Sequence, residues 1–186
     1  SNLAGLMFPF LGQQLRGGQK IDIIGCEPLS CPSFTKGKYA YDHGDMARMT
    51  PLIKMHTLGS DFLPPANHSG GLRYHGMSYH LSHLYDLGLM RAKAYGQKDC
   101  FEAGVIFGKQ EGIIPAPEGN HAVKGAIDAA LECKEKGESK TILFNLCGHG
   151  HFDMTAYDDY FSGKLADDFY DEASANESLS HLPEIE

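Results

Sequence analysis

The sequence predicts an α/β domain with a mainly parallel sheet flanked by helices. Short apolar runs that are typical of buried strands alternate along the chain with longer segments in which apolar residues recur at helical spacing. Glycine and proline separate these segments and mark the turns between them. Alternation of strands and helices is the pattern of parallel sheets, because parallel strands need a crossover connection that a helix usually supplies.

The first half of the chain contains fewer clear elements than the second. Residues 21–25 form an apolar run that Gly25 and Pro28 are expected to stop as a strand. Residues 26–76 include five prolines among several glycines, so we expect long irregular connections there. A helix is expected over residues 77–87, followed by a strand over residues 89–95.

The second half shows two strong helical patterns and one further strand. A helix is predicted over residues 98–111, with Gly112 as its C-terminal stop. Residues 113–117 must then be extended, and Asn120 is expected to cap a second helix that ends at Gly137. Residues 140–146 are predicted to be a fully buried strand. Asp153 is expected to cap a last helix that ends near Gly163.

Composition and charge exclude several classes of protein. The net charge is −8, and residues 166–186 contain seven acidic residues and no Lys or Arg, which predicts a solvated, partly frayed and disordered tail. The body lacks the Lys/Arg cluster of a nucleic-acid reader. No apolar stretch approaches the roughly 20 residues that span a bilayer, and five widely spaced cysteines without a C-x-x-C pair fit a reducing compartment. We therefore expect a soluble, cytoplasmic protein without nucleic-acid or membrane partners.

Two loops contain side chains that could bind a ligand or take part in catalysis. Ligands of open parallel sheets bind beyond the carboxyl ends of the strands, which directs attention to residues 147–151 and 115–121. Cys147, His149 and His151, with Asp153, could bind zinc, although the two imidazoles would point in opposite directions if the segment is extended. A loop that contacts a cofactor and a plain structural turn are the alternatives. His80 and His83 on the predicted helix are a weaker metal candidate, since surface histidines are common.

Four motifs occur together in a specific order and spacing. They are SNLAGL at residues 1–6, GGLRYHG at 70–76, GIIPAPE at 112–118 followed by His121 and Ala122, and NLCGHG at 145–150. Together they resemble the tryptophan synthase β family, most of all its second, often stand-alone lineage. The resemblance implies a domain over residues 1–165, the C-terminal part of a fold-type II pyridoxal-phosphate enzyme, and an acidic tail over 166–186.

The resemblance also implies roles for individual residues. Ser1 and Asn2 match the end of the loop that wraps the cofactor phosphate, although the two residues could instead be the remnant of an expression tag. Cys147, next to Gly148, matches a position that faces the pyridine nitrogen and usually holds serine; a small cysteine that merely packs beneath the loop is the alternative. Glu118 matches a carboxylate near the ring, and it also suits a helix N-terminus.

The resemblance further implies that backbone carbonyl groups bind a monovalent cation. The candidate ligands are the backbone carbonyls of Tyr74 and Gly76. Arg73 stands where the α-subunit-coupled lineage has an acidic residue, so an ion pair of that lineage cannot be transferred to this chain.

The activity that the resemblance implies is pyridoxal-phosphate-dependent β-replacement, which joins L-serine and indole to give L-tryptophan and water. The family's Schiff-base lysine follows a histidine, and none of the twelve lysines here does, so we expect that lysine upstream of Ser1 and an inactive fragment. The expected partners are the missing N-terminal half, a second copy in a homodimer of the complete enzyme, and an α-subunit. A serine dehydratase and a non-catalytic metal-binding or interaction domain are the alternative functions.

Overall fold

Two small β-sheets lie at the centre of the computed structural model, which describes residues 2–167 and 169–185. β1 (Ile24–Pro28) pairs in parallel with β4 (Arg91–Tyr95). β2 (Lys38–His43) and β3 (Leu52–Thr57) form an antiparallel hairpin. The chain is therefore α/β with a parallel sheet, as the sequence predicts, although each sheet has only two strands among the described residues.

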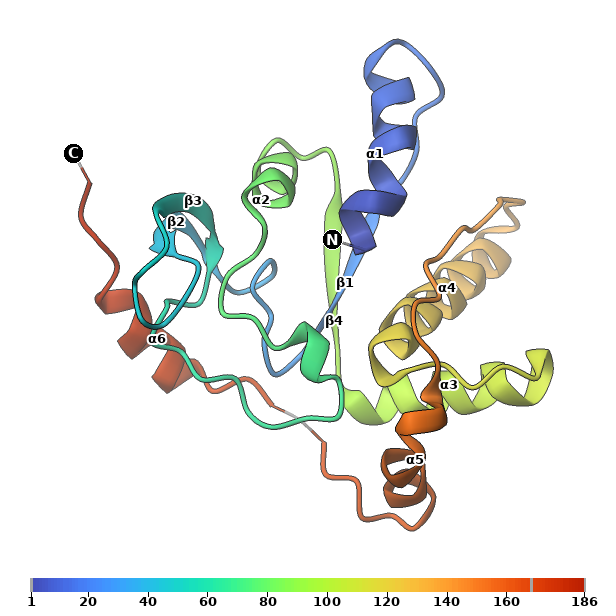
Figure 1. Cartoon of the computed structure of the whole chain (residues 1–186). Coiled ribbons are helices and arrows are strands. Elements are labelled where there is room, and N and C mark those ends of the chain that lie inside the picture. Colours follow the sequence, from blue (N-terminus) through green and yellow to red (C-terminus); the bar gives the residue numbers. More distant parts are fainter. Residues whose placement is uncertain (1, 168, 186) are drawn as a thin grey trace.

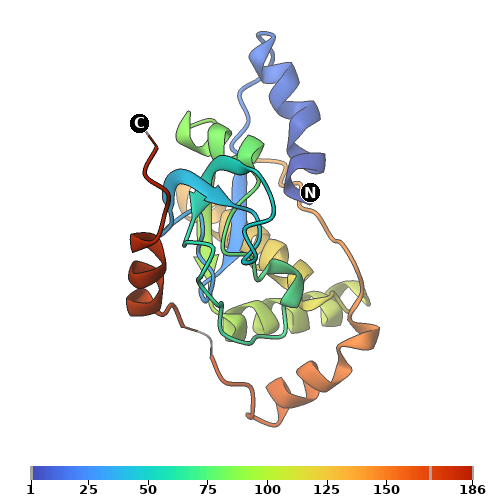
Figure 2. The same ribbon diagram turned by 60° about the vertical axis from the view of Figure 1, so that its left-hand side comes forward.

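Helices surround these sheets on several sides. They are α1 (Asn2–Leu15), α2 (Tyr79–Asp86), α3 (Gln97–Glu111), α4 (Pro117–Lys136), α5 (Met154–Phe161) and α6 (Glu172–Ser180), with short 3-10 turns η1 (Gly70–Leu72) and η2 (Gly150–Phe152). In Figure 1, α3 and α4 lie on one side of β1 and β4, and the β2–β3 hairpin and α6 lie on the other. Figure 2 shows α1 and α5 at opposite ends of the chain's long dimension. None of these helices in the described part of the chain has the length and apolar composition needed to cross a bilayer.

Three buried clusters hold the elements together. One packs α1 and α2 against the parallel sheet and contains Met7, Leu11, Ile23, Phe34, Leu81 and Met90. A second joins α5 to α3 through Phe101, Ala156, Tyr157 and Leu165. A third places α6 against the residues that follow β1 and β3, through Cys31, Leu58, Phe62 and Ala175. Their distribution explains why the chain holds a defined shape around such small sheets.

The strongest helical patterns are confirmed. α3 ends at Gly112 and α4 ends at Gly137, and both glycines adopt the left-handed conformation, with φ of 70° and 66°. This conformation closes a helix because the glycine lacks the Cβ that would clash there. The predicted helix over residues 77–87 and strand over 89–95 are also present, as α2 and β4.

Two predictions for the first half are wrong in detail. The strand expected over residues 21–25 begins at Ile24 and continues through Gly25 to Pro28, because a proline at the last position removes no essential ladder donor. The region expected to be irregular contains the β2–β3 hairpin. Its strands carry Lys, Asp and His between their apolar residues, so they lack the apolar runs that indicate a buried strand.

One prediction for a helix cap is wrong, and a second is confirmed in position only. Ala116, not Asn120, is the N-cap of α4, and Pro117 occupies the first helical position, where its missing N–H costs nothing. Asn120 lies inside the helix and is fully buried. Asp153 precedes α5 as expected, but its side chain makes no capping hydrogen bond.

The strand predicted over residues 140–146 is not formed. The segment has no ladder partner among the described residues, and its side chains are not fully buried, since Leu143 is 60% exposed. A strand depends on hydrogen bonds to a neighbour, so an apolar run alone cannot establish one.

The acidic C-terminal segment is partly ordered rather than frayed. α6 forms within it, and Ala175 and Ser178 on this helix are buried. Gly59, with a φ of +91°, lies directly beneath Ser178, and a Cβ built on Gly59 would overlap the Ser178 side chain. The close approach of this glycine therefore helps to dock the helix.

Candidate functional site

The first turn of α1 contacts the loop that follows residues 140–146. The Asn2 amide Nδ2 donates a hydrogen bond to Cys147 Sγ at 3.3 Å, although the two residues are 145 positions apart. These are two of the residues that the resemblance assigns to the cofactor site. Ser1, also assigned to it, lies outside the described residues.

The loop at Cys147 and Gly148 packs against the start of α4. A Cβ built on Gly119 would lie 3.3 Å from the Cys147 carbonyl oxygen, and one built on Gly148 would lie 3.1 Å from Ala116 Cβ. The Gly150 N–H donates to the Ile114 carbonyl at 2.8 Å. Gly148 has a φ of +68°, which lets the chain turn at this point without strain. The two loops singled out in the sequence are therefore neighbours in space.

Glu118 lies in the first turn of α4 and reaches across to η1. Its Oε1 accepts a hydrogen bond from the Gly71 N–H at 2.9 Å. The negative charge also suits the positive end of the α4 dipole, which is the second role considered for this carboxylate. Burial raises the pKa of the nearby Asp153, and the charge of Glu118 raises it further. A local excess of negative charge thus borders the site.

Tyr74 and Gly76, the candidate cation ligands, lie on a segment fixed to β3. The Tyr74 carbonyl accepts hydrogen bonds from Cys31 Sγ at 2.7 Å and from Ser33 Oγ at 3.0 Å. Gly76 forms an isolated antiparallel bridge with Thr57. The Tyr74 carbonyl is thus already held by two donors in this structure.

The histidines near the loop do not point in opposite directions. His149 and His151 flank the start of η2, and their ring centroids are 4.8 Å apart, because the segment turns here instead of remaining extended. Across the described part of the chain, no group of three or more His, Cys, Asp or Glu side chains could hold a metal ion. His80 and His83 are exposed, and the His80 ring lies against Tyr79 at 4.0 Å between centroids.

A buried clamp beneath the site was not anticipated from the sequence. Tyr157 on α5 donates its hydroxyl to the Pro115 carbonyl at 2.6 Å, and the Asn120 amide donates to the Tyr157 oxygen at 3.1 Å. This clamp fixes the loop that leads into Glu118. No local pattern could have revealed it, because Tyr157 is far from its partners in sequence and Asn120 is typical of a cap.

Comparison with characterised proteins identifies the relatives of this chain. It is 58% identical, over 89% of its length, to tryptophan synthase beta chain 2 of Methanosarcina mazei. It is 56% identical, over 90% of its length, to tryptophan synthase beta chain 2 of Aquifex aeolicus. The tryptophan synthase beta chain of Pyrococcus horikoshii is 50% identical over 98% of the chain. The chain is a relative of the tryptophan synthase β family. No protein-family model matches it.

The match to the tryptophan synthase β family is confined to one part of its members. The chain spans 37% to 39% of the length of these three relatives, in their C-terminal portion. This confirms the family resemblance inferred from the four motifs, including the restriction to the C-terminal part. More than half of each relative therefore lies outside the match.

Proposed function

We propose that this chain forms one wall of the active site of a fold-type II pyridoxal-phosphate enzyme that joins L-serine and indole to give L-tryptophan and water. The contact between Asn2 and Cys147 is the main support, because it joins two positions from separate motifs that the family resemblance assigns to the cofactor site. The packing of Gly148 against the start of α4 brings the Glu118 turn to the same place. The names of the relatives agree with this chemistry.

The residues present fit a phosphorylated pyridine ring. Asn2 opens α1, a helix of 14 residues, whose unpaired N–H groups and dipole favour an anion such as a phosphate. The Cys147 sulfur accepts from Asn2, which leaves its S–H able to donate weakly to a ring nitrogen. Gly148 adds no side chain beside the ring position, and Glu118 supplies a carboxylate at its border. Ser1 is proposed to extend the phosphate site.

Pyridoxal phosphate, when bound, would supply an electron sink for bond cleavage in an amino acid. Cys147 would present a neutral partner to the pyridine nitrogen and so moderate that sink. Glu118 is held by Gly71, so it would stay oriented at the edge of the site, where it can exclude water or hold a proton. The lysine that the chemistry requires has no counterpart among the lysines of this chain, so the chain alone should be inactive.

The remaining assignments are proposals that follow from the family. A monovalent cation would bind the carbonyls of Tyr74 and Gly76, and it would have to share Tyr74 with its two present donors. The partners would be the N-terminal portion of the enzyme, a second copy in a homodimer, and an α-subunit, in the cytoplasm. The domain over residues 1–165 would contain the whole cofactor wall.

Alkylation of the cysteines tests where the cofactor binds. We would label the chain with iodoacetamide with and without 4-deoxypyridoxine 5′-phosphate, which lacks the aldehyde and so cannot react with lysines. We expect the ligand to slow labelling of Cys147 and not of Cys133, a half-buried cysteine on α4 that serves as the internal control. Equal rates at Cys147 with and without saturating ligand would contradict the proposal.

Activity is tested by adding the N-terminal portion of the Methanosarcina mazei relative. Because the indole substrate fluoresces much as tryptophan does, the product is separated from indole before it is quantified. We expect product from the mixture, measured by chromatography, and none from either polypeptide alone. Product from the chain alone would overturn the assignment of an incomplete site.

A further inference from the structure

The Tyr74 carbonyl faces two buried side chains from another part of the chain. The Cys31 S–H donates to this oxygen at 2.7 Å, and the Ser33 O–H donates to it at 3.0 Å. Cys31 is 1% exposed and Ser33 is fully buried, whereas Tyr74 itself is 63% exposed. A carbonyl oxygen has two lone pairs, so these two donors use its whole accepting capacity.

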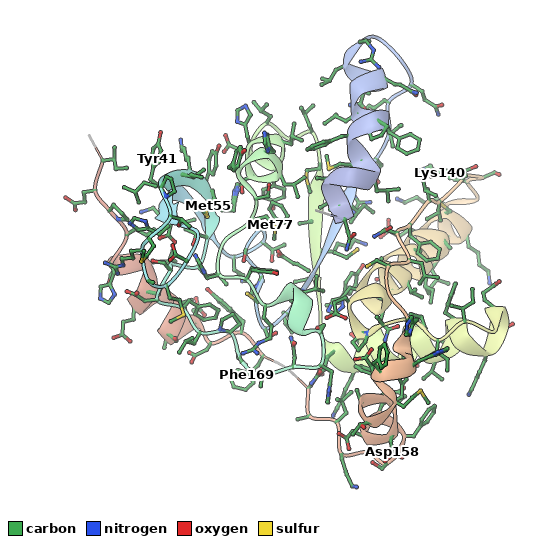
Figure 3. The ribbon with its side chains drawn as sticks, in the orientation of Figure 1. Tyr41, Met55, Met77, Lys140, Asp158 and Phe169 are labelled. Atoms are coloured by element: carbon green, nitrogen blue, oxygen red, sulfur yellow. The ribbon has the colours of Figure 1, made fainter. Side chains whose placement is uncertain are left out.

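The segment that contains this carbonyl is fixed against β3. The Met77 N–H donates to the His56 carbonyl at 2.8 Å. A Cβ built on Gly76 would lie 2.6 Å from Met55 Sδ, so the backbone packs closely on the strand. Figure 3 shows Met77 near Met55. The backbone from Tyr74 to Gly76 therefore has little freedom to turn a carbonyl toward a new ligand.

The two donors are also fixed in place. Both lie in the turn after β1, where the Glu27 carboxylate accepts hydrogen bonds from the N–H groups of Phe34 and Thr35, each at 2.9 Å. Cys31 packs against Ala175 of α6 in a buried cluster. Burial raises the pKa of the Cys31 thiol to about 12, so the thiol keeps its proton and remains a donor near neutral pH.

A cation at the Tyr74 carbonyl would compete with these donors. The S–H and O–H hydrogens carry partial positive charge and already point at the lone pairs that a cation would use. The cation could bind only by displacing at least one of them, and a buried donor that loses its acceptor is costly. Ser33 has a second acceptor, the His75 carbonyl at 3.3 Å, but this exchange replaces a shorter bond with a longer one.

We propose that Cys31 and Ser33 take the place of the monovalent cation at the Tyr74 carbonyl and thereby weaken cation binding at the proposed site. The two donors hold this carbonyl whether or not an ion is present. The chain should therefore need the ion less than a protein whose carbonyl has no such donors. The inference rests on the proposed cation site, and it does not depend on pyridoxal phosphate or on catalysis.

Urea unfolding in different chloride salts tests the competition. We would compare KCl and CsCl with tetramethylammonium chloride at equal ionic strength, because tetramethylammonium is too large to enter a carbonyl site. We expect the natural chain to unfold at the same urea concentration in all three salts. Cys31→Ala combined with Ser33→Ala should be stabilised by K⁺ or Cs⁺, with an apparent dissociation constant at least about tenfold below that of the natural chain, because the ion then satisfies the vacated carbonyl.

Control variants separate this effect from a loss of packing. Cys31→Ser keeps a donor at the same position, and Cys100→Ala removes a thiol that is equally buried on α3. We expect neither control to gain a preference for K⁺ or Cs⁺. An equal preference in Cys100→Ala would reveal a general salt effect and overturn the proposal. Weaker cation binding by Ser33→Ala would make the Ser33 hydroxyl a ligand of the ion and would overturn it as well.

The titration is repeated with the N-terminal portion of the Methanosarcina mazei relative. A preference for K⁺ that the double variant shows only in this mixture would support the proposal and mean that the N-terminal portion supplies a further ligand. No preference in either sample, or one equally strong in the natural chain, would overturn it. Because none of these readings uses the cofactor or the product, the labelling of Cys147 and the formation of tryptophan still decide the proposed function.

Discussion

Glu118 and Gly71 are joined by a hydrogen bond of 2.9 Å that ties the start of α4 to the η1 turn. The two residues belong to separate motifs, and a Cβ built on Gly71 would lie 3.0 Å from the Glu118 oxygen. The glycine thus allows the carboxylate to approach the backbone. The hydrogen bond also connects the proposed cofactor wall to the segment that leads to Tyr74.

Gly71→Ala should therefore loosen the turn and destabilise the chain. We expect a loss of about 1 kcal/mol in the free energy of unfolding, the size of one hydrogen bond to a partly exposed carboxylate, measured by urea denaturation. Gly70→Ala is the matched control, because nothing lies within 4 Å of a Cβ built there. Equal losses for the two variants would show that the Glu118 contact contributes nothing.

Tyr157→Phe should lower the free energy of unfolding more than Gly71→Ala does, because the Tyr157 hydroxyl holds two buried partners. The substitution leaves the Pro115 carbonyl and the Asn120 amide without this bond, and we expect a loss of about 1–3 kcal/mol in thermal or urea unfolding. Tyr160→Phe, on the same helix and only partly buried, should cost less. The idea fails if the two variants unfold at the same urea concentration.

His56 should make stability depend on pH. Burial among Phe34, Tyr39 and Tyr85 lowers its pKa, so the folded chain favours the neutral ring. The stability that the neutral His56 ring allows is present above the unfolded pKa of about 6.5 and is lost as the pH falls below that value. Nδ1 is buried without a partner among the described residues, so His56→Phe should fold normally.

The measurement for His56 is the drop in unfolding free energy between pH 7 and pH 5.5. We expect a smaller drop in His56→Phe than in the natural chain, and an unchanged drop in His83→Asn, which alters an exposed histidine on α2. A drop of the same size in all three proteins would refute the assignment.

Ala175→Asp should detach α6 from the body of the chain. Ala175 is fully buried against Cys31, Leu58 and Phe62, so a charge there costs about 2 kcal/mol or more. We expect faster proteolysis within residues 169–185, and no such change for Ala173→Asp on the exposed face of the same helix. Unaltered cleavage of Ala175→Asp would mean that α6 is not docked in solution.

The sequence predicts those elements whose signals are local. Helices α3 and α4 end where Gly112 and Gly137 adopt left-handed conformations, and a glycine after a helical pattern is a local signal. The segment of residues 141–147 could not be placed correctly, because strand formation depends on a partner that no local pattern reveals. The proximity of Cys147 to Asn2 was accessible only through the family motifs, since the two residues are 145 positions apart in the sequence.

The close approach of Gly59 to Ser178 sets a limit on sequence divergence. Any side chain at position 59 must both tolerate a left-handed backbone and displace a serine on α6. Shortening Ser178 would still leave its backbone carbonyl carbon 2.7 Å from a Cβ at position 59 and would not remove the backbone penalty, so no single compensating mutation frees the site. Descendants of this protein should therefore retain the glycine for as long as they retain the helix.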